Sequence, residues 1–391
     1  MKILYLHQYF NTNESSGGTR SYEFSNELTK AGHEVVVITG KDIETSSINN
    51  EKLKILSTNT EYSNKMGFLR RVLAFFHYIF FAIKLSLKVK DIDVVFATST
   101  PITIGVPGYI VSKLKKAKFI FEVRDVWPDV PIELGFINNK ILIYLLKKYE
   151  LFIYKQADYI IALSKGMKRN ILSKGDFKNK LSVITNLANL EIYNNIEINK
   201  ERIKENYGLE NKFICIHPGT MGFVNGLDFI LDTANLTKDN KEIHYLLIGS
   251  GKEKGKLQTR VEKENMNNVT IADSLPKKDI IKVIKASDLG LMVVRNEFKI
   301  LEDNSANKFF DFLAAGLPIL INYEGWQKET IENNEAGFST LTPKEMAEKI
   351  VSLKDDRILR DNMEKNSKEI AGKFSKKSAC NELLNIIENI I

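Results

Sequence analysis

Residues 303–322, DNSANKFFDFLAAGLPILIN, place polar side chains at the start of a helix that leads into a buried strand. Asn307 and Asp311 are four positions apart, so they share one face near the helix N-terminus. Backbone N–H groups converge there and attract an anion, and Lys308 adds a positive charge. The pattern indicates a site for a nucleotide diphosphate, with Asp311 accepting from sugar hydroxyls. An ordinary amphipathic helix with a solvated first turn is the alternative.

The residues around this helix define its ends. Asn304 and Ser305 precede it and are residue types that cap helix N-termini. Gly316 follows its apolar face, and Pro318 comes two residues later, as is common where helices stop.

Glycine loops follow several expected strands. Gly17 and Gly18 lead into a helix and let the backbone approach an anion, and Arg20 adds a forked donor; a flexible surface turn is the alternative. The spacing is not GxGxxG, which argues against a dinucleotide dehydrogenase. The run Gly219-Thr220-Met221-Gly222 opens onto a helix beginning near Asn225, an arrangement typical of phosphate binding. Gly249 closes the next strand and suits either close approach to a ligand or a tight turn.

Arg124 and Asp125 end another expected strand, 118–123. Parallel sheets place ligands at the carboxyl ends of their strands, so Arg124 is expected either to bind phosphate or to hold Asp125 in place. A purely structural ion pair is the alternative.

Residues 65–90 combine an apolar, aromatic run with basic flanks. The run from Val72 to Ile83 is shorter than the roughly 20 residues that span a bilayer. It is interpreted either as a buried helix of the sheet or as an interfacial helix whose aromatics enter lipid, and the two are compatible if one face packs inward.

Composition narrows the partners. The 391 residues carry a net charge of +7, and 43% are hydrophobic, enough for two or three packed cores. The charge favours an anionic partner, and the absence of nucleic-acid motifs leaves phosphorylated substrates and an anionic membrane surface. Two cysteines, Cys215 and Cys380, and no metal-ligand spacing predict a cytoplasmic protein without a metal or cofactor. No signal peptide is expected at the N-terminus.

Apolar runs alternate with helical patterns in both halves, which predicts two α/β domains with parallel sheets. The polar, Asn-rich stretch 186–210 marks the linker, giving domains 1–190 and 191–372 and a terminal helical segment 373–391. Expected strands are 2–9, 34–39, 93–98, 118–123, 158–163 and 181–185 in the first half and 213–217, 244–248, 268–272, 288–294, 318–322 and 337–340 in the second.

Six segments in this order resemble the retaining, family-four glycosyltransferases of the GT-B fold, in particular the N-acetylfucosaminyltransferase-like branch of O-antigen and capsule assembly. They are LHQYF with SGGTR (6–10, 16–20), FEVRDVWPD (121–129), ADYIIALSKGMKRNIL (157–172), GTMGFVNGLD (219–228), LLIGSGKEKGKL (246–257) and ANKFFDFLAAGLPIL (306–320). The resemblance implies two Rossmann-like domains facing across a cleft, with the last helix crossing back to the first domain.

The resemblance also implies roles for single residues. The glycine loop at 17–18 meets the donor diphosphate or the acceptor, and Ser274 and Leu275 lie in the loop that meets the nucleobase. Relatives often carry arginine and lysine where Thr220 and Asn225 stand, so Lys308 and Arg295 become the candidate cations for the diphosphate.

Two further positions depart from the family pattern. Asp303 and Asp311 replace two glutamates, and the shorter Asp303 reaches less far toward the donor sugar. Arg124-Asp125 stands where many relatives have His-Asp, so no histidine base is assigned.

These observations predict a metal-independent, retaining transferase that moves a sugar, expected to be an N-acetylated amino sugar, from a UDP-type donor. The acceptor would be a polyprenyl-diphosphate-linked saccharide at the inner membrane face, where the protein would be peripheral. Two alternatives stay open: a UDP-sugar epimerase of the same fold, and an inactive membrane partner of another transferase.

Overall fold

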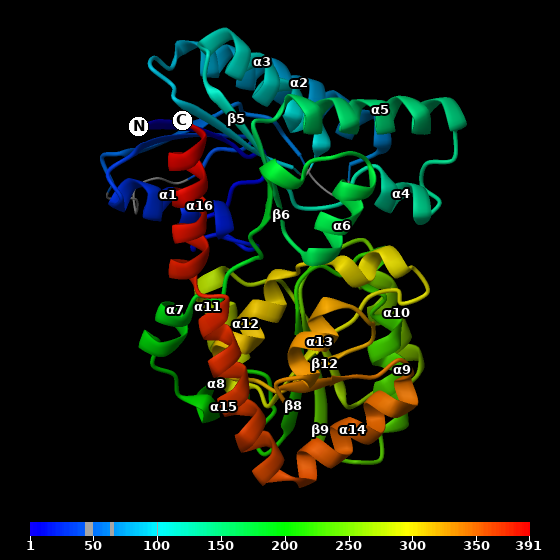
Figure 1. Cartoon of the computed structure of the whole chain (residues 1–391). Helices are drawn as coiled ribbons and strands as arrows, with labels where there is room; N and C mark the ends of the chain where they lie inside the picture. Colours follow the sequence, from blue (N-terminus) through cyan, green and yellow to red (C-terminus); the bar gives the residue numbers. More distant parts are fainter. Residues whose placement is uncertain (44–49, 63–65, 100) are drawn as a thin grey trace. The chain divides into compact units, whose positions relative to one another are not determined.

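The computed structural model describes residues 1–43, 50–62, 66–99 and 101–391. The chain folds into two compact units, each built on a parallel sheet (Figure 1). Unit 1 comprises Met1–Thr12, Thr19–Thr185 and Lys377–Ile391, and unit 2 comprises Asn13–Gly18 and Asn186–Lys376. The expectation of two α/β domains with parallel sheets is confirmed.

Within the described residues, unit 1 has a seven-stranded parallel sheet in the order β3-β2-β1-β4-β5-β6-β7. Its strands are β1 (Lys2–Leu6), β2 (Glu34–Thr39), β3 (Leu53–Ser57), β4 (Val94–Thr98), β5 (Lys118–Val123), β6 (Tyr159–Ala162) and β7 (Leu181–Val183). Its helices are α1 (Arg20–Lys30), α2 (Phe68–Lys88), α3 (Gly105–Lys115), α4 (Asp129–Glu133), α5 (Lys140–Gln156), α6 (Lys165–Ser173) and nearly all of α16 (Lys376–Ile390), with short 3₁₀ turns η1 (Ile102–Ile104) and η2 (Lys178–Lys180).

Unit 2 has a six-stranded parallel sheet in the order β10-β9-β8-β11-β12-β13. Its strands are β8 (Phe213–Pro218), β9 (Ile243–Ile248), β10 (Val269–Ala272), β11 (Leu289–Met292), β12 (Ile319–Ile321) and β13 (Gly337–Ser339). Its helices are α7 (Leu190–Asn195), α8 (Lys200–Glu205), α9 (Asp228–Leu236), α10 (Lys254–Lys263), α11 (Lys277–Ala286), α12 (Asn307–Ala315), α13 (Trp326–Glu332), α14 (Pro343–Asp355) and α15 (Arg357–Lys373), with η3 (Phe223–Asn225) and η4 (Lys299–Asp303).

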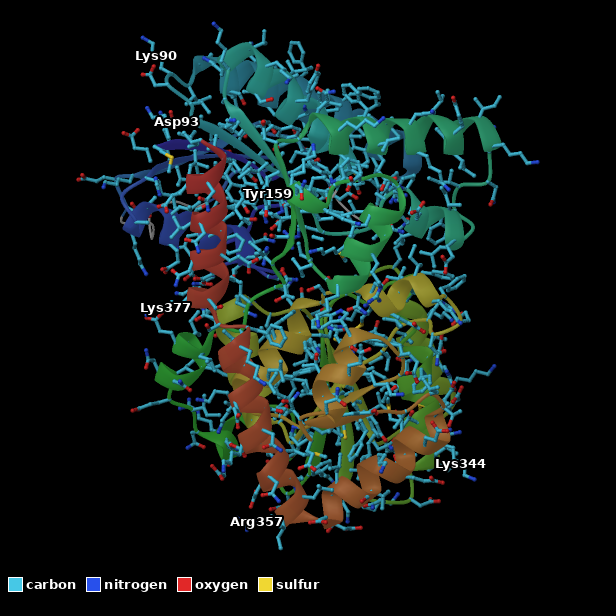
Figure 2. All side chains as sticks on the ribbon, in the orientation of Figure 1. Lys90, Asp93, Tyr159, Lys344, Arg357 and Lys377 are labelled. Atoms are coloured by element: carbon cyan, nitrogen blue, oxygen red, sulfur yellow. The ribbon has the colours of Figure 1, made fainter. Side chains whose placement is uncertain are left out.

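The strands are buried on both faces, which is why they appear in the sequence as continuous apolar runs. In β1, Ile3 pairs with Val35 of β2 on one side and Val94 of β4 on the other, and all three side chains are fully buried. Side chains fill the layers between sheet and helices in each unit (Figure 2). This packing fixes where the carboxyl ends of the strands, and the loops that follow them, must lie.

Two local expectations need correction. Strand β3 was not expected, because its sequence LKILS is short and mixes polar with apolar residues, as suits its place at the sheet edge. Helix α12 begins after Ala306, and neither Asn304 nor Ser305 caps it. The Asn304 Oδ1 instead accepts from the Ala306 N–H, and the Ser305 Oγ accepts from the Asn186 N–H.

Helix α2 contains most of the basic, aromatic segment expected at 65–90; Lys65 lies outside the described residues. One side of α2 packs inward through Ala74, Tyr78 and Ala82, and the other side is exposed. Among the helices of the described residues, none is long and apolar enough to cross a membrane.

Candidate functional site

In unit 2, the loops that follow β8 and β9 are bonded to each other through their backbones. The Gly219 N–H donates to the Ile248 carbonyl at 2.8 Å, and the Met221 N–H donates to the Ser250 carbonyl at 2.8 Å. A Cβ atom on Gly249 would lie 1.8 Å from the Gly219 oxygen, so only glycine fits there. Gly249 therefore permits the close approach of the two loops.

Lys308, in the first turn of α12, extends beside this loop pair. Its Nζ donates to Nε2 of His217 at 2.8 Å, and the His217 Nδ1–H donates to the Leu291 carbonyl at 3.0 Å. The Lys308 Cε lies 3.4 Å from where a Cβ on Gly219 would be. Lys308, expected from the sequence, is thus placed at the exposed Gly219–Thr220 turn, with a histidine as its partner.

Burial governs the charges of this pair. Burial lowers the pKa of Lys308 to about 7. Burial is the main cause that lowers the pKa of His217 well below its ordinary value, and the nearby Lys308 charge lowers it further. The imidazole is therefore neutral and remains an acceptor, and the lysine is poised to gain full charge when an anion arrives.

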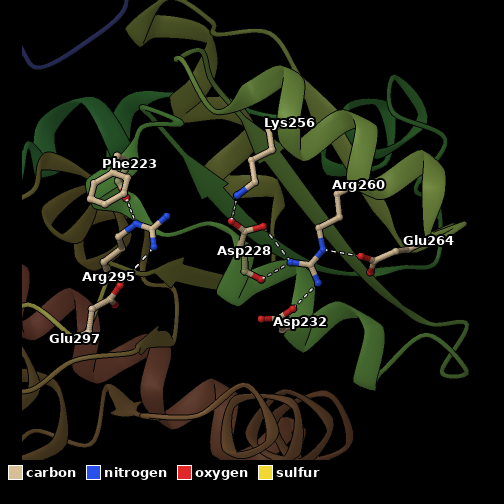
Figure 3. Close-up of polar contacts among 8 residues, drawn as sticks. All are labelled: Phe223, Asp228, Asp232, Lys256, Arg260, Glu264, Arg295 and Glu297. Atoms are coloured by element: carbon tan, nitrogen blue, oxygen red, sulfur yellow. Dashed lines mark hydrogen bonds and ion pairs between the residues drawn. The ribbon is translucent and has the colours of Figure 1, made fainter.

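Arg295 lies against the second part of the Gly219 loop (Figure 3). Its Nε donates to the Phe223 carbonyl at 2.8 Å, its guanidinium lies 4.0 Å from the centre of the Phe223 ring, and Glu297 is 3.4 Å from its Nη1. Gly222 and Asn225 in the same loop are half-buried, and Thr220 is exposed. Arg295 thus supports the shape of the loop, and its charge lies on the side of Phe223.

Asp311 is held by a lysine that the sequence reading did not single out. Both carboxylate oxygens accept from Lys277 Nζ, at 2.5 and 2.6 Å. The Lys277 N–H donates to the Ser15 carbonyl at 3.1 Å, which brings the segment Asn13–Gly18 against this part of unit 2. Asp311 thus lies beside the glycine segment with its carboxylate already oriented.

The glycine segment also contacts the start of α12. A Cβ on Gly18 would lie 2.4 Å from the Asn307 Nδ2, and Gly17 has a φ of +116°. The structure therefore brings together Gly17, Gly18, Asn307, Lys308 and Asp311, as the sequence predicts for a common site.

The residues at the edge of the site differ in burial and in their polar partners. Asp303 ends η4 and is half-buried, and the Asn304 carbonyl accepts from the indole N–H of Trp326 at 2.9 Å. Burial raises the pKa of the neighbouring Glu302, and the Glu324 and Asp303 charges add to the rise while Lys299 opposes it. Ser274 is exposed.

Leu275, next to Ser274, packs on the core of unit 2. Its backbone, and not its side chain, is therefore what the loop after β10 can offer a ligand.

Three predicted residues belong to unit 1. Arg20 is 2% exposed and bonds Oε1 of Glu122 through Nε at 3.0 Å and Nη2 at 2.8 Å. It also donates to the Ile184 and Thr185 carbonyls. The expectation of a free forked donor is therefore corrected, because the guanidinium is committed to an internal partner.

Arg124 and Asp125 follow β5 in unit 1. Nη1 of Arg124 lies 3.4 Å from Nε2 of His7, and the Arg124 N–H donates to the Ser99 hydroxyl at 2.8 Å. His7 is fully buried, and burial together with the Arg124 charge lowers its pKa well below the ordinary value. Asp125 is exposed. His7, at the end of β1, is a further polar residue that the residue patterns did not single out.

Signals for the missed residues exist in the sequence. His217 is the last but one residue of the buried strand β8, two residues before Gly219, where parallel sheets place their ligands. Lys277 is the first residue of α11, and a lysine there opposes the helix dipole unless it has an anionic partner. Within the described residues, no group of three His, Cys, Asp or Glu side chains is placed to hold a metal ion.

Two family models match the chain in succession. "Glycosyltransferase Family 4" matches residues 17–192, and "Glycosyl transferases group 1" matches residues 199–370. A curated relative is N,N'-diacetylbacillosaminyl-diphospho-undecaprenol alpha-1,3-N-acetylgalactosaminyltransferase of Campylobacter jejuni, 22% identical over 96% of this chain and 98% of that protein. An uncharacterized glycosyltransferase of Methanocaldococcus jannaschii is 25% identical over 81% of this chain and 80% of that protein.

Solved structures share the fold over the whole chain. A glycosyltransferase of Rickettsia africae superposes with a TM-score of 0.74 at 18% identity, covering 100% of this chain and 98% of that one. HepE of Anabaena in complex with UDP-glucose gives a TM-score of 0.76 at 15% identity, covering 100% of both chains. The two successive family matches and the two-sheet architecture together identify the chain as a glycosyltransferase of the GT-B type.

Proposed function

We propose that the protein transfers a sugar, an N-acetylated amino sugar, from a UDP-linked donor to a polyprenyl-diphosphate-linked saccharide, with retention and without a metal ion. The observation that carries the proposal is the placement of Lys308 beside the exposed Gly219 turn at the start of α12, opposite a neutral histidine. This is a site for a diphosphate, the group that leaves when a nucleotide sugar reacts.

Unit 2 supplies the donor contacts in this proposal. Lys308 and the backbone N–H groups of Thr220, Gly222 and the α12 start bind the diphosphate, while the Gly219 and Met221 N–H groups hold the loop to its neighbour. Asp311, oriented by Lys277, accepts from the ribose hydroxyls. The complex of Anabaena HepE with UDP-glucose supports a UDP-type donor on this fold.

The chemical step follows from these contacts. The acceptor hydroxyl attacks the anomeric carbon on the face that the diphosphate leaves, and its proton passes to the departing phosphate. Lys308 and the loop amides stabilise the charge that grows on that phosphate. No protein nucleophile is required.

Unit 1 takes the acceptor in this proposal, at the inner face of the cell membrane, where the protein is peripheral and contributes to surface polysaccharide synthesis. The Campylobacter relative, whose name describes a diphospho-undecaprenol-linked acceptor, supports a lipid-linked substrate. Arg124, at the end of β5 and beside His7, is the candidate cation for its phosphates.

The test is transfer from a panel of radiolabelled UDP-sugars to polyprenyl-diphosphate saccharides, with and without EDTA. We expect a lipid-linked product whose anomeric configuration matches that of the donor and a rate that EDTA leaves unchanged. Lys308→Ala serves as the low-activity control. Epimerised donor without transfer would establish the epimerase alternative, and UDP binding without turnover on any acceptor would establish an inactive partner.

A further inference from the structure

Helix α2 has a second apolar side that is exposed among the residues described by the structure. Leu69, Leu73, Phe76 and Phe80 recur at intervals of four, three and four residues, so they form one stripe. Leu73 is 67% exposed and Phe76 is 65% exposed. The stripe lies opposite the core side of the same helix. Packing within unit 1 therefore does not explain it.

Helix α5 also has an exposed apolar region, formed by consecutive residues in its first turns. From Lys140 to Lys148 the helix has no buried residue, although Ile141, Leu142, Ile143, Tyr144, Leu145 and Leu146 are all apolar or aromatic. Ile141 is 73% exposed. The core contacts of α5 begin at Tyr149, and its buried residues are Glu150, Ile153 and Tyr154. The first two turns of α5 are thus apolar and, within the described residues, remain largely exposed.

Helix α3 contacts both α2 and α5 and so connects their two exposed apolar regions. Lys115 of α3 donates to the Leu87 carbonyl of α2 at 2.8 Å, and the Tyr109 ring of α3 lies 5.1 Å from the Phe152 ring of α5. The three helices lie beside one another over one face of the sheet, and side chains project from them on the side away from it (Figures 1 and 2). Their outer sides form one surface, here called the docking face.

The docking face is strongly basic. Helices α2, α3 and α5 contain ten lysine and arginine residues and one carboxylate, Glu150. Glu150 is buried and bonded to Lys174 and Tyr154, so it does not offset the surface charge. Lys84 and Lys148 lie over the rings of Phe81 and Tyr144, which puts positive charge next to one half-buried and one exposed aromatic ring.

Unit 1 as a whole carries the charge of the chain. It holds 28 lysine and arginine residues against 18 aspartate and glutamate residues, a net charge of +10. Unit 2 holds 28 against 31, a net charge of −3, and the two values add to the +7 of the chain. The excess that favours an anionic partner is therefore entirely in the unit that carries the docking face.

We propose that the docking face binds an anionic lipid bilayer. The apolar residues 141–146 of α5 and the apolar stripe of α2 would both enter the lipid. The inference deepens the proposed function, because it names the surface that brings the protein to its lipid-linked acceptor. Apolar stripes bordered by lysines match the layered chemistry of a bilayer, hydrocarbon beneath anionic headgroups. A second copy fits less well, since the face would bring like charges together.

The full-length protein is mixed with sedimenting vesicles of phosphatidylcholine alone, or of phosphatidylcholine containing phosphatidylglycerol. We expect binding only to the anionic vesicles at low salt, with partial release at about 0.5 M salt, where charges are screened within a few ångströms. A protein that stays in the supernatant with all vesicles would overturn the proposal.

Variants then locate the contact. Replacing Ile141, Tyr144 and Leu145 by serine, or Leu69, Leu73 and Phe76 by serine, should lower the vesicle partition coefficient about tenfold or more in each case. The matched control replaces Leu236, Leu341 and Ile358 of unit 2, which are similarly exposed, and should bind as wild type does.

A charge series follows the same design. Each change of Arg70, Lys84 or Lys148 to glutamine should weaken binding about fivefold, since a basic residue near an anionic surface contributes about 1 kcal/mol. The same changes at the exposed Lys238, Lys263 and Lys344 of unit 2 are the control. Unchanged vesicle binding in the α5 serine variant would remove α5 from the surface and refute the inference.

Two further measurements keep the outcomes separate. UDP affinity should be unchanged in every docking-face variant, because the nucleotide contacts lie in unit 2. Vesicle binding without UDP binding would refute the proposed function and leave the docking face standing. A concentration-dependent dimer that the α5 variant abolishes, without vesicle binding by wild type, would assign the face to a second copy instead.

Discussion

Lys308 is paired with a neutral imidazole, and this partner keeps its charge available to a ligand. A carboxylate at position 217 would neutralise the lysine permanently, whereas His217 only accepts one hydrogen bond from it. Burial lowers the pKa of the free lysine to about 7, so an arriving diphosphate finds a group that gains charge as it binds. In the proposed reaction the same group stabilises the leaving phosphate.

Replacing Lys308 by alanine should weaken UDP binding by about 1.5–3 kcal/mol, the contribution of a charged hydrogen bond. Isothermal titration of wild type and variant with UDP measures the difference. Lys238→Ala, at an exposed position of unit 2, is the control and should leave the affinity unchanged. Equal affinity in Lys308→Ala and wild type would remove this lysine from the site.

UDP affinity should depend on pH through Lys308. In the free protein its pKa is lowered to about 7, and a bound diphosphate raises the pKa because it favours the charged form. Below pH 7 the lysine is already protonated, so its contribution is complete. Above pH 7 binding must take up a proton, and this contribution falls by up to about tenfold per pH unit.

Titrations in buffers of different ionisation enthalpy measure this proton uptake directly. Lys308→Arg, which stays charged throughout, provides the comparison and also corrects for titration of UDP itself. Proton uptake that is the same in both proteins at pH 8 would show that Lys308 is not the linked group.

Asp311 should make the protein selective for ribose. A carboxylate that accepts from ribose hydroxyls loses one bond with 2′-deoxy-UDP, a difference of about 1.5–3 kcal/mol. Wild type should prefer UDP, and Asp311→Asn, which keeps the side-chain shape, should lose most of that preference. Direct titration of both proteins with both nucleotides decides, and a preference that survives the substitution would assign Asp311 to another role.

Some contacts of the site could be read from the sequence and others could not. Lys308 and Asp311 were predictable because one helix turn carries both and the helix start attracts anions. Their partners His217 and Lys277 come from other strands and helices, 91 and 34 residues away along the chain. The ligand-binding role predicted for Arg20 was wrong for the same reason. Its internal partner Glu122 lies 102 residues further along the chain.

At the scale of elements, the position of the site follows from the ends of β8 and β9 and from the start of α12. The loops after the two strands meet backbone to backbone, and glycine at 249 is the condition for that approach. Gly219, with a φ of +128°, turns the first loop outward. The shape of the turn therefore depends on the backbone conformation of Gly219 and on the absence of a side chain at Gly249.

Gly249→Ala should distort this loop pair, because the new Cβ would lie 1.8 Å from the Gly219 carbonyl oxygen. We expect a loss of about 1–3 kcal/mol in the free energy of unfolding, as for overpacked sites, together with weaker UDP binding. Chemical denaturation and UDP titration measure the two effects.

Gly255→Ala is the matched control. Gly255 lies inside α10 with nothing within 4 Å of the added Cβ, so this change should stabilise the protein by about 0.4–1 kcal/mol. A Gly249→Ala variant that is as stable as wild type and binds UDP as well would show that the loop approach is not required.

Element type was predictable wherever burial is two-sided. Strands such as β8 and β9 are mostly apolar because helices cover both faces of their sheet, and this gives a clear signal. Edge strand β3 lacks the signal, since its residues are only partly buried. For α2 the pattern fitted two interpretations, because the helix has one apolar side in the core and another exposed.

At the scale of the whole molecule, two units of similar architecture carry net charges of opposite sign, +10 in unit 1 and −3 in unit 2. The sequence predicted two domains from the repeated alternation of strands and helices, with an Asn-rich linker between them. It gave no sign that Asn13–Gly18 would belong to unit 2, because that assignment rests on contacts with residues far along the chain, such as Lys277 and Asn307.

The end of the chain also belongs to unit 1, through residues Lys377–Ile391 of α16. Leu383 and Ile387 of this helix are fully buried. Leu383→Ala should therefore destabilise unit 1 by about 2–5 kcal/mol, the usual cost of truncating a buried leucine. Because Leu383 is distant in sequence from the rest of unit 1, this loss of stability would show that the end of the chain packs into unit 1.

Hydrogen exchange measured by mass spectrometry distinguishes the two units in one experiment. Peptides from β1, β2 and α1 should exchange faster in Leu383→Ala than in wild type, while peptides from β8 and β9 keep their protection. Ile358→Ala, at a position of α15 that is 76% exposed, is the control and should leave both sets unchanged. Faster exchange in the unit 2 peptides, with unit 1 unaffected, would mean that α16 stabilises unit 2 instead. UDP affinity should persist in Leu383→Ala because the proposed nucleotide contacts lie in unit 2.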